Sequence, residues 1–228
     1  MPLSSDPDLD NIRENLLMMS SLADRNLGLA VRALTERDSA LCDMVESEDS
    51  QIDALEVAID EQVITYMALN SPVATDCRFM LVACKVSGNF ERVGDEAVSI
   101  ARRARQLNAE PAMAVIDTLA EMAELALEML RDSVRAFIEG DIELTRAIKK
   151  RDKEVDRMEK RVADNMREVM EADPSKVASA LKVVMITRSL ERVADHAKNV
   201  AEEIFYLFEA RDIRHVGAGT NQPRSPGS

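Results

Sequence analysis

The sequence predicts an all-α protein made of two pseudo-symmetric, antiparallel three-helix bundles, and three observations support this prediction. First, the 228-residue chain contains only 7 Gly and 7 Pro, and aromatic residues make up 3% of it. Such a composition, rich in Ala, Leu, Met, Glu and Arg, is typical of helices and excludes an all-β or doubly wound fold. Second, apolar residues recur at helical spacing. Third, the chain repeats itself about 100 residues further on.

Turn-forming residues are few, so each group of them marks the end of one helix and the start of the next. In chain order, the breaks are Arg37-Asp38-Ser39, Asn70-Ser71-Pro72, the stretch from Asn108 to Pro111, Gly140-Asp141 and Asp173-Pro174. Between breaks the apolar residues form one stripe on a helix. In the first segment these residues are Ile12, Leu16, Met19, Ala23, Leu27, Ala30 and Leu34.

Six long helices follow from these breaks. The predicted helices cover residues 8–37, 39–69, 72–107, 112–139, 141–171 and 175–211. Pro72 and Pro174 each follow a helix-capping Ser or Asp, so we expect them in the first turn of the helix that they begin. Helices of this length are stable only when they pack along their whole length.

An internal repeat aligns the first half of the chain with the second. Residues 19–56 match residues 122–159 at 13 of 38 positions, where chance gives about two. Residues 90–101 match residues 190–201 at 6 of 12 positions. Three helices followed by the same three helices predict two bundles related by pseudo-symmetry.

The repeat divides the chain into two predicted domains and a tail. We expect a first three-helix repeat at residues 8–110 and a second at 111–211. The short connections within each repeat imply that neighbouring helices run antiparallel. Residues 212–228 hold 3 of the 7 Gly and 2 of the 7 Pro and show no periodicity, so we expect a flexible tail.

The charge and the cysteines limit the partners and the compartment. Lys and Arg number 29 against 42 Asp and Glu, a net charge of −13. Nucleic-acid binding requires basic residues that neutralise phosphates, so we expect none. No apolar run approaches the ~20 residues of a membrane span, and the acidic N-terminus lacks signal-peptide features. The three isolated cysteines, Cys42, Cys77 and Cys84, are expected to be reduced and packed as small hydrophobic residues, which predicts a cytoplasmic protein.

Four carboxylate pairs carry the clearest chemical information. The pairs are Asp49 with Asp53, Glu91 with Asp95, Asp152 with Asp156, and Glu191 with Asp195. Their i,i+4 spacing stacks two carboxylates on one helical face, where they repel each other by roughly a few tenths of a kcal/mol. Chance gives about seven such pairs in so acidic a chain, so a single pair indicates only a solvated face. These four, however, occupy matching positions on the second and third helices of both repeats.

The paired carboxylates predict metal binding. In an antiparallel bundle, a pair from the second helix can meet a pair from the third and supply about four oxygen ligands. Oxygen ligands suit Mg²⁺, Mn²⁺, Ca²⁺ or iron, and no Cys/His set exists for a structural zinc. Asn199 lies four residues beyond Asp195 and adds an amide oxygen, whereas its counterpart Ser99 is a weaker ligand.

Other functions stay open on the residues alone. A ferritin-type di-iron enzyme needs Glu-x-x-His on two helices, and neither His196 nor His215 has a Glu three positions earlier. A histidine phosphotransfer protein would use His196, which points about 100° away from the acidic face. A helical adaptor without metal would use the same long helices. No nucleophile–base pair and no Gly-rich phosphate-binding loop occur, so we expect no enzymatic activity.

The duplicated signature resembles that of the PhoU family, the phosphate-specific transport accessory proteins that regulate the phosphate regulon. That family shows Leu-Glu-Arg-Ile/Val-Gly-Asp in each of two three-helix repeats, and this chain has Glu-Arg-Val-Gly-Asp at 91–95 and Glu-Arg-Val-Ala-Asp at 191–195. Two further stretches are similar, the lead-in Pro72…Asp76-x-Arg78…Lys85 and the ending at 205–217. The resemblance covers residues 10–217. The chain departs from the family pattern at Ser99 and Ala194.

This resemblance implies a fold, a metal centre and a role. The fold is a pair of three-helix bundles. The metal centres are surface clusters of divalent or trivalent ions, namely iron, manganese, magnesium or zinc. The positions that match the family's motifs are Asp49, Asp53, Glu91, Asp95, Asp152, Asp156, Glu191, Asp195 and Asn199.

The implied role is regulatory. When phosphate is sufficient, the family conveys the status of the phosphate transporter to a sensor histidine kinase and represses the phosphate-starvation response. The expected partners are therefore the transporter's ATPase, PstB, and the kinase, PhoR. We also expect a homodimer that meets the membrane only through these partners.

Overall fold

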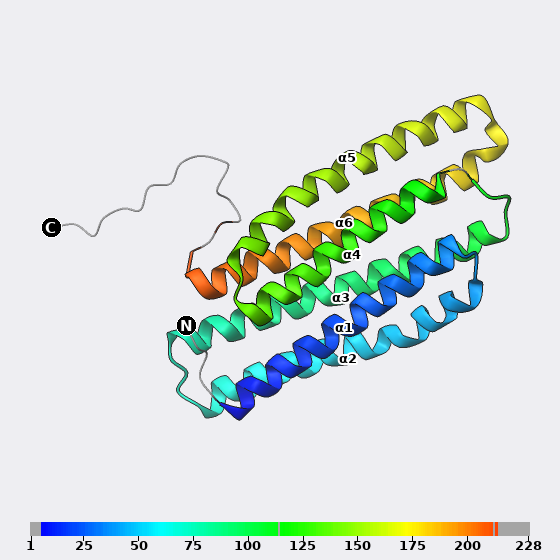
Figure 1. Ribbon diagram of the computed structural model, residues 1–228. Helices are drawn as coiled ribbons and strands as arrows, with labels where there is room; N and C mark the ends of the chain where they lie inside the picture. The colour runs from blue at the N-terminus through cyan, green and yellow to red at the C-terminus, as the bar shows by residue number, and fades with distance from the viewer. Residues whose placement is uncertain (1–5, 114, 212, 214–228) are drawn as a thin grey trace.

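The protein is a bundle of six long helices, seen in a computed structural model that describes residues 6–113, 115–211 and 213 (Figure 1). The helices are α1 (Pro7–Thr35), α2 (Ser39–Leu69), α3 (Ala74–Asn108), α4 (Ile116–Glu139), α5 (Ile142–Ala172) and α6 (Val177–Glu209), with a 3₁₀ turn, η1 (Pro174–Lys176), before α6. The all-α prediction is confirmed. The predicted tail at 212–228 lies outside the described residues, except for Ile213.

The six helices form two three-helix groups that lie side by side. Helices α1, α2 and α3 pack on one another, and so do α4, α5 and α6. The main contact between the groups is α3 against α6, with a smaller contact between α1 and α4. Figure 1 shows α2 and α5 on opposite outer edges, with α3 and α6 between them. The arrangement agrees with two packed copies of one bundle; the domain boundaries at 110 and 111 stay a prediction.

Side-chain caps fix several helix starts at the predicted breaks. The Asp38 carboxylate accepts a hydrogen bond from the Ala40 backbone N–H at 2.9 Å and caps α2. Asp141 caps α5 in the same way, accepting from Glu143 at 2.9 Å. Asp173 accepts from Ser175 at 3.0 Å and begins the 3₁₀ turn with Pro174 in its first position. Each cap satisfies a backbone donor that the helix itself leaves unpaired.

The turns that follow α1 and α4 each contain a residue in the left-handed backbone conformation, but the residue type differs between them. Gly140 has φ +68° and Arg37, its equivalent in the repeat, has φ +57°. Glycine adopts this left-handed conformation without strain, whereas arginine does not. The Arg37 guanidinium, however, donates hydrogen bonds to the backbone carbonyls of Leu107 (3.3 Å), Asn108 (2.8 Å) and Glu110. Arg37 therefore ties the α1–α2 turn to the end of α3.

Five predicted helix ends are wrong by two to four residues. Two of them belong to the sixth helix, which spans Val177–Glu209 instead of 175–211, because the 3₁₀ turn Pro174–Lys176 precedes it and Ala210 has a positive φ of 53°. The first helix ends at Thr35 instead of residue 37, because the positive φ of Arg37 stops it. The third begins at Ala74 instead of Pro72, since Val73 is extended and the Asp76 carboxylate accepts its N–H at 3.3 Å. The fourth begins at residue 116 instead of 112, because the preceding segment is held by contacts from Arg37 and from α6.

The predicted apolar stripe of α1 forms part of the core. Ile12, Met19, Ala23 and Leu27 have no exposed surface. The prediction that all the cysteines are packed is wrong for one of them. Cys42 is buried and Cys84 is half-buried, but Cys77 is exposed; all three are free thiols.

Within the described ranges of the chain, none of the helices combines the length and the hydropathy that a membrane span requires.

Candidate metal-binding seams

The predicted ligands of the first repeat lie along the contact between α2 and α3, which we call the first acidic seam. Asp49 and Asp53 come from α2, and Glu91 and Asp95 come from α3. The two helices approach closely here because Gly94 has no side chain: a Cβ atom at Gly94 would lie 3.1 Å from Asp49 Oδ1. The seam thus brings both predicted pairs to the same stretch of surface.

The carboxylates of this seam repel one another. Burial raises the pKa of Asp49, and the charges of Asp53 and Asp95 raise it further, while the Arg102 guanidinium opposes the shift. Burial likewise raises the pKa of Glu91, with the neighbouring Asp95 carboxylate adding to it. A raised pKa means that the charged form of a carboxylate is disfavoured at this place. A bound cation would stabilise that charged form.

The first acidic seam also contains Glu56, a carboxylate that was not among the ligands predicted from the sequence. Burial raises the pKa of Glu56, as do the nearby Asp60, Asp53 and Asp95 charges. Glu56 and its equivalent Glu159 are identical in the internal repeat, three residues after Asp53 and Asp156. That match is the signal by which the sequence could have identified them.

The carboxylates of the first acidic seam lie near one another but do not form a preorganised metal site. Among the residues that the structure describes, no three His, Cys, Asp or Glu side chains converge as a ready set of ligands for a metal ion. Like charges on adjacent helices favour rotamers that point apart into solvent. The four-ligand set of the first repeat therefore stays a prediction, and it requires the side chains to turn toward a bound ion.

The second acidic seam, between α5 and α6, differs from the first because a lysine lies in it. Lys198 Nζ is 3.1 Å from Asp152 Oδ2 and also donates a hydrogen bond to Asp195 Oδ1. Two of the predicted ligands of this repeat are thus bound to an ammonium group of the chain itself. Burial raises the pKa of Glu191, and Glu159 and the three aspartates of the seam raise it further.

Asn199 and His196 lie on the α3-facing side of α6. Asn199 Nδ2 donates a long hydrogen bond, 3.4 Å, to Asp195 Oδ2, so its amide reaches the edge of the second seam. His196 Nδ1 lies 3.0 Å from Asn89 Oδ1 on α3. Burial lowers the pKa of His196. The imidazole is thus half-buried and engaged across the two repeats, unlike the exposed imidazole that phosphotransfer requires.

Basic side chains gather between the two acidic seams, along the contact of α3 with α6. A hollow of about 450 Å³ there is lined on α3 by Lys85 and Arg92, and on α6 by His196, Asn199 and Glu203. Lys85 Nζ is paired with the buried Glu203 carboxylate at 3.2 Å. The face formed by α2, α3, α6 and α5 therefore alternates acidic, basic and acidic.

A second hollow, of about 510 Å³, borders the first acidic seam. It is lined by Asp49 and Asp95 of the seam together with Val98, Ser99, Arg102, Arg103, Gln106, Lys182 and Met185. Ser99 Oγ lies 3.2 Å from Ser189 Oγ of α6 and accepts from Arg103, so it faces the other repeat. The counterpart of Asn199 thus has its partners on α6 and α3.

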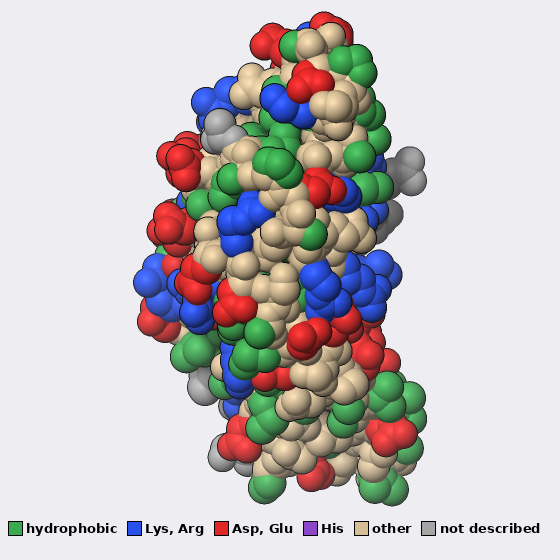
Figure 2. All heavy atoms as spheres, turned by 90° about the vertical axis from the view of Figure 1, so that its right-hand side faces the viewer, with side chains coloured by type: hydrophobic (Ala, Val, Ile, Leu, Met, Phe, Trp, Pro, Cys, Tyr) green, Lys and Arg blue, Asp and Glu red, His purple; other side chains and the backbone are tan. Residues whose placement is uncertain are grey.

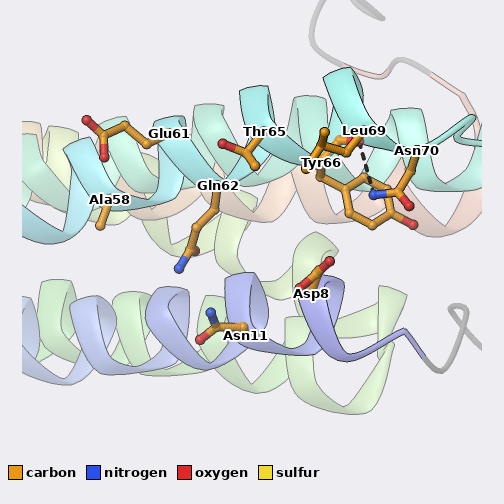
Figure 3. Close-up of a pocket in the computed structure, with 9 residues that line it drawn as sticks. All are labelled: Asp8, Asn11, Ala58, Glu61, Gln62, Thr65, Tyr66, Leu69 and Asn70. Carbon is orange, nitrogen blue, oxygen red and sulfur yellow. Dashed lines mark hydrogen bonds between the residues drawn. The ribbon is translucent and has the colours of Figure 1, made fainter.

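Two other surfaces lie away from the predicted ligands. A hollow of about 320 Å³ between the start of α1 and the end of α2 is lined mainly by Asn, Gln, Thr and Tyr side chains, with Asp8 and Glu61 pointing in different directions (Figure 3). Figure 2 shows the end of the molecule where the α1–α2, α3–α4 and α5–α6 connections lie, and basic and acidic side chains alternate over it. The charged side chains that line the hollow, Asp8 and Glu61, are both acidic, whereas the end in Figure 2 shows both signs of charge.

Comparison with known proteins identifies relatives of the whole fold. The family model of the PhoU domain matches twice, at residues 16–104 and 119–204. The phosphate-specific transport system accessory protein PhoU homolog of Pseudomonas putida is 35% identical over 212 residues, 92% of this chain and 82% of that protein. The PhoU accessory protein of Escherichia coli is 31% identical over 210 residues, 92% of this chain and 87% of that protein.

Solved structures agree with this match. The crystal structure of PhoU from Pseudomonas aeruginosa superposes with a TM-score of 0.87 at 33% identity, covering 90% of this chain and 98% of that one. The phosphate transport system regulatory protein PhoU from Streptococcus pneumoniae superposes with a TM-score of 0.83 at 24% identity, covering 90% and 97%. The second comparison supports the fold alone.

Proposed function

The chain belongs to the PhoU family, and we propose that it is a regulatory adaptor of phosphate homeostasis. In this role it couples the phosphate transporter to a sensor histidine kinase and represses the phosphate-starvation response when phosphate is sufficient. The observation that carries the proposal is the double domain match, which covers both repeats of one chain. The relatives are named accessory proteins of the phosphate-specific transport system.

The proposed partners are the ATPase of the phosphate transporter and the cytoplasmic part of a PhoR-like kinase. Contact with these partners would place the protein in the cytoplasm, next to the membrane but not in it. The long antiparallel helices support an adaptor because they offer extended, rigid faces on opposite sides (Figure 1). We also propose a homodimer, which doubles the faces available to partners.

An adaptor of this kind acts without chemistry of its own. A protein that binds one conformation of a kinase more tightly than another shifts the kinase toward the first. Coupling free energies of about 1–3 kcal/mol, which change an equilibrium roughly 5- to 150-fold, are sufficient. The proposal therefore includes no catalytic residue.

Direct binding measurements test the adaptor role. The purified chain should bind the PstB-like ATPase and the cytoplasmic part of the PhoR-like kinase from the same organism, measured by biolayer interferometry. The ATPase of an unrelated transporter, measured in parallel, should not bind. Failure to bind both the ATPase and the kinase would contradict the adaptor role.

We further propose that the first acidic seam binds a metal ion, with iron, manganese, magnesium and zinc as candidates. Asp49, Asp53, Glu91 and Asp95 supply oxygen donors from two packed helices, and Glu56 adds a fifth carboxylate nearby. The raised pKa values of Asp49 and Glu91 support a cation at this place. A bound ion would offset the repulsion across the seam and lock α2 to α3.

Metal analysis tests this second part. The wild-type chain, saturated with Mn²⁺ or iron and then desalted, should retain more metal than the double variant Glu91→Ala/Asp95→Ala. An exposed pair outside both seams, Asp164→Ala/Glu168→Ala on α5, is the matched control and should retain as much as the wild type. Equal retention in the wild type and in the seam variant would end the metal proposal while leaving the adaptor role intact.

A further inference from the structure

Lys198 distinguishes the second acidic seam from the first. Its ammonium group lies between one carboxylate of α5 and one of α6, 3.1 Å from Asp152 Oδ2 and hydrogen-bonded to Asp195 Oδ1. The side chains of Lys198 and Asp152 are 21% and 14% exposed. The lysine thus occupies the space between the same two positions that the paired motifs predict as ligands on adjacent helices.

The first seam has no equivalent of this lysine. The repeat aligns Lys198 with Val98, whose side chain has no charge. Val98, Asp49 and Asp95 line the 510 Å³ hollow, and Asp49 and Asp95 are the equivalents of Asp152 and Asp195. Three basic side chains also line it, and each of them binds another group: Arg102 pairs with Glu46, Arg103 donates to Ser99, and Lys182 donates to Glu110. The position of the tethered ammonium in the second repeat therefore carries an uncharged side chain beside a hollow in the first.

A tethered ammonium competes strongly with a free cation for the same oxygens. Lys198 is covalently held beside its partners, so its effective concentration does not fall on dilution, and its hydrogen bonds to both carboxylates are already formed. A metal ion that bound Asp152 and Asp195 would have to displace the ammonium and leave it half-buried without a partner. The remaining carboxylates of the seam are Asp156, Glu159 and Glu191.

We propose that Lys198 is a built-in counter-ion that excludes metal from the second seam, so that metal binding by this chain is confined to the α2–α3 seam. The inference rests on the proposed metal-binding function and deepens it. It assigns different roles to the two repeats: the first responds to a free cation, and the second is permanently closed.

Substitutions exchanged between the repeats test this assignment. Mn²⁺ binding, followed by the electron paramagnetic resonance of free Mn²⁺ during titration, is compared in the wild type, Lys198→Met and Val98→Lys. Lys198→Met keeps most of the apolar stem and removes the charge, and it should roughly double the Mn²⁺ bound per chain. Val98→Lys should extend into the hollow beside Asp49 and Asp95 and abolish the wild-type binding.

A matched control and a fold check complete the experiment. Lys149→Met removes another lysine that bridges α5 and α6, to Glu202 at 3.2 Å, but does not contact a predicted ligand; it should bind Mn²⁺ as the wild type does. Circular dichroism establishes that each variant is helical. Lys198→Val, which copies the first repeat, replaces Lys198→Met if the latter does not fold.

The possible results separate this inference from the function on which it rests. Unchanged Mn²⁺ binding in Lys198→Met overturns the inference, whatever the wild type binds. Binding by Lys198→Met but not by the wild type supports the role of Lys198 and contradicts the metal site at the first seam. Binding by the wild type that is lost in Val98→Lys and increased in Lys198→Met supports both.

Discussion

Asn26 is a polar side chain in an apolar position. It has no exposed surface, and neither its Oδ1 nor its Nδ2 has a hydrogen-bond partner in the described part of the chain. The repeat aligns it with Met129, which is buried to the same extent. A buried amide without partners costs free energy that a methionine at the same place does not.

Replacing Asn26 with methionine should therefore stabilise the protein. We expect Asn26→Met to raise the free energy of unfolding by about 1–3 kcal/mol, measured by urea denaturation with circular dichroism. The reverse change in the other repeat, Met129→Asn, should lower it. Destabilisation by Asn26→Met would indicate that Asn26 has a buried partner.

The predicted ligands illustrate what sequence can and cannot show at the scale of residues. The carboxylate pairs were predictable because their i,i+4 spacing and their repetition are properties of the sequence itself. The bridging by Lys198 was not, since it depends on how α5 packs against α6. The hydrogen bond between His196 and Asn89, 107 positions apart, depends on the packing of α3 against α6 in the same way.

At the scale of helices, local capping determined which ends could be predicted. Asp38, Asp141 and Asp173 cap the following helical turns at the predicted breaks, because a cap is set by a few consecutive residues. The start of α3 was placed too early because Ser71-Pro72 resembles a cap followed by a first-turn proline, whereas Val73 is extended. The start of α4 depends on contacts with distant parts of the chain, which no local pattern shows.

The cap of α5 gives a prediction of this kind. Asp141 accepts hydrogen bonds from the backbone N–H groups of Glu143 and Leu144, at 2.9 and 3.4 Å. Asp141→Ala should lower the free energy of unfolding by about 0.5–2 kcal/mol, whereas Asp141→Asn, which keeps an accepting oxygen, should lower it much less. Thermal unfolding of the two variants checks this. Equal losses would show that the charge, not the acceptor, matters.

A second element-scale feature links the α3–α4 connection to α6. The Glu110 carboxylate accepts hydrogen bonds from Lys182 Nζ and Ser179 Oγ. These contacts lower the pKa of Glu110 in the folded protein, and the hydrogen bond from Lys182 contributes most. The stabilisation is therefore present above the pKa of an unfolded glutamate, and it is lost as the pH falls through the lower folded-state pKa.

The pH dependence of stability measures this contact. At neutral pH, Glu110→Gln should be less stable than the wild type by less than about 1 kcal/mol, since the pair is partly exposed. The difference should shrink as the solution is acidified below the usual range of a glutamate. Glu124→Gln, at an exposed position of α4, serves as the control. A difference that grows on acidification would contradict the assignment.

At the scale of the whole molecule, duplication is the dominant feature, and the two copies differ in charge where Lys198 of the second aligns with Val98 of the first. Each copy contributes three packed helices and one acidic seam, and the copies join along α3 and α6. The architecture was predictable because apolar periodicity and self-alignment are global properties of the sequence. The charge pattern of the joined face was not, since Lys85 and Arg92 of α3 meet His196 and Glu203 of α6 only when the repeats pack.

We propose that this chain represses the phosphate-starvation response when phosphate is sufficient. The most direct test is the expression of a phosphate-starvation reporter in high phosphate, compared between the parent strain, a strain in which this gene is deleted, and the deletion strain carrying the gene on a plasmid. We predict constitutive expression in the deletion strain and repression restored by the plasmid. Normal repression in the deletion strain would contradict the account.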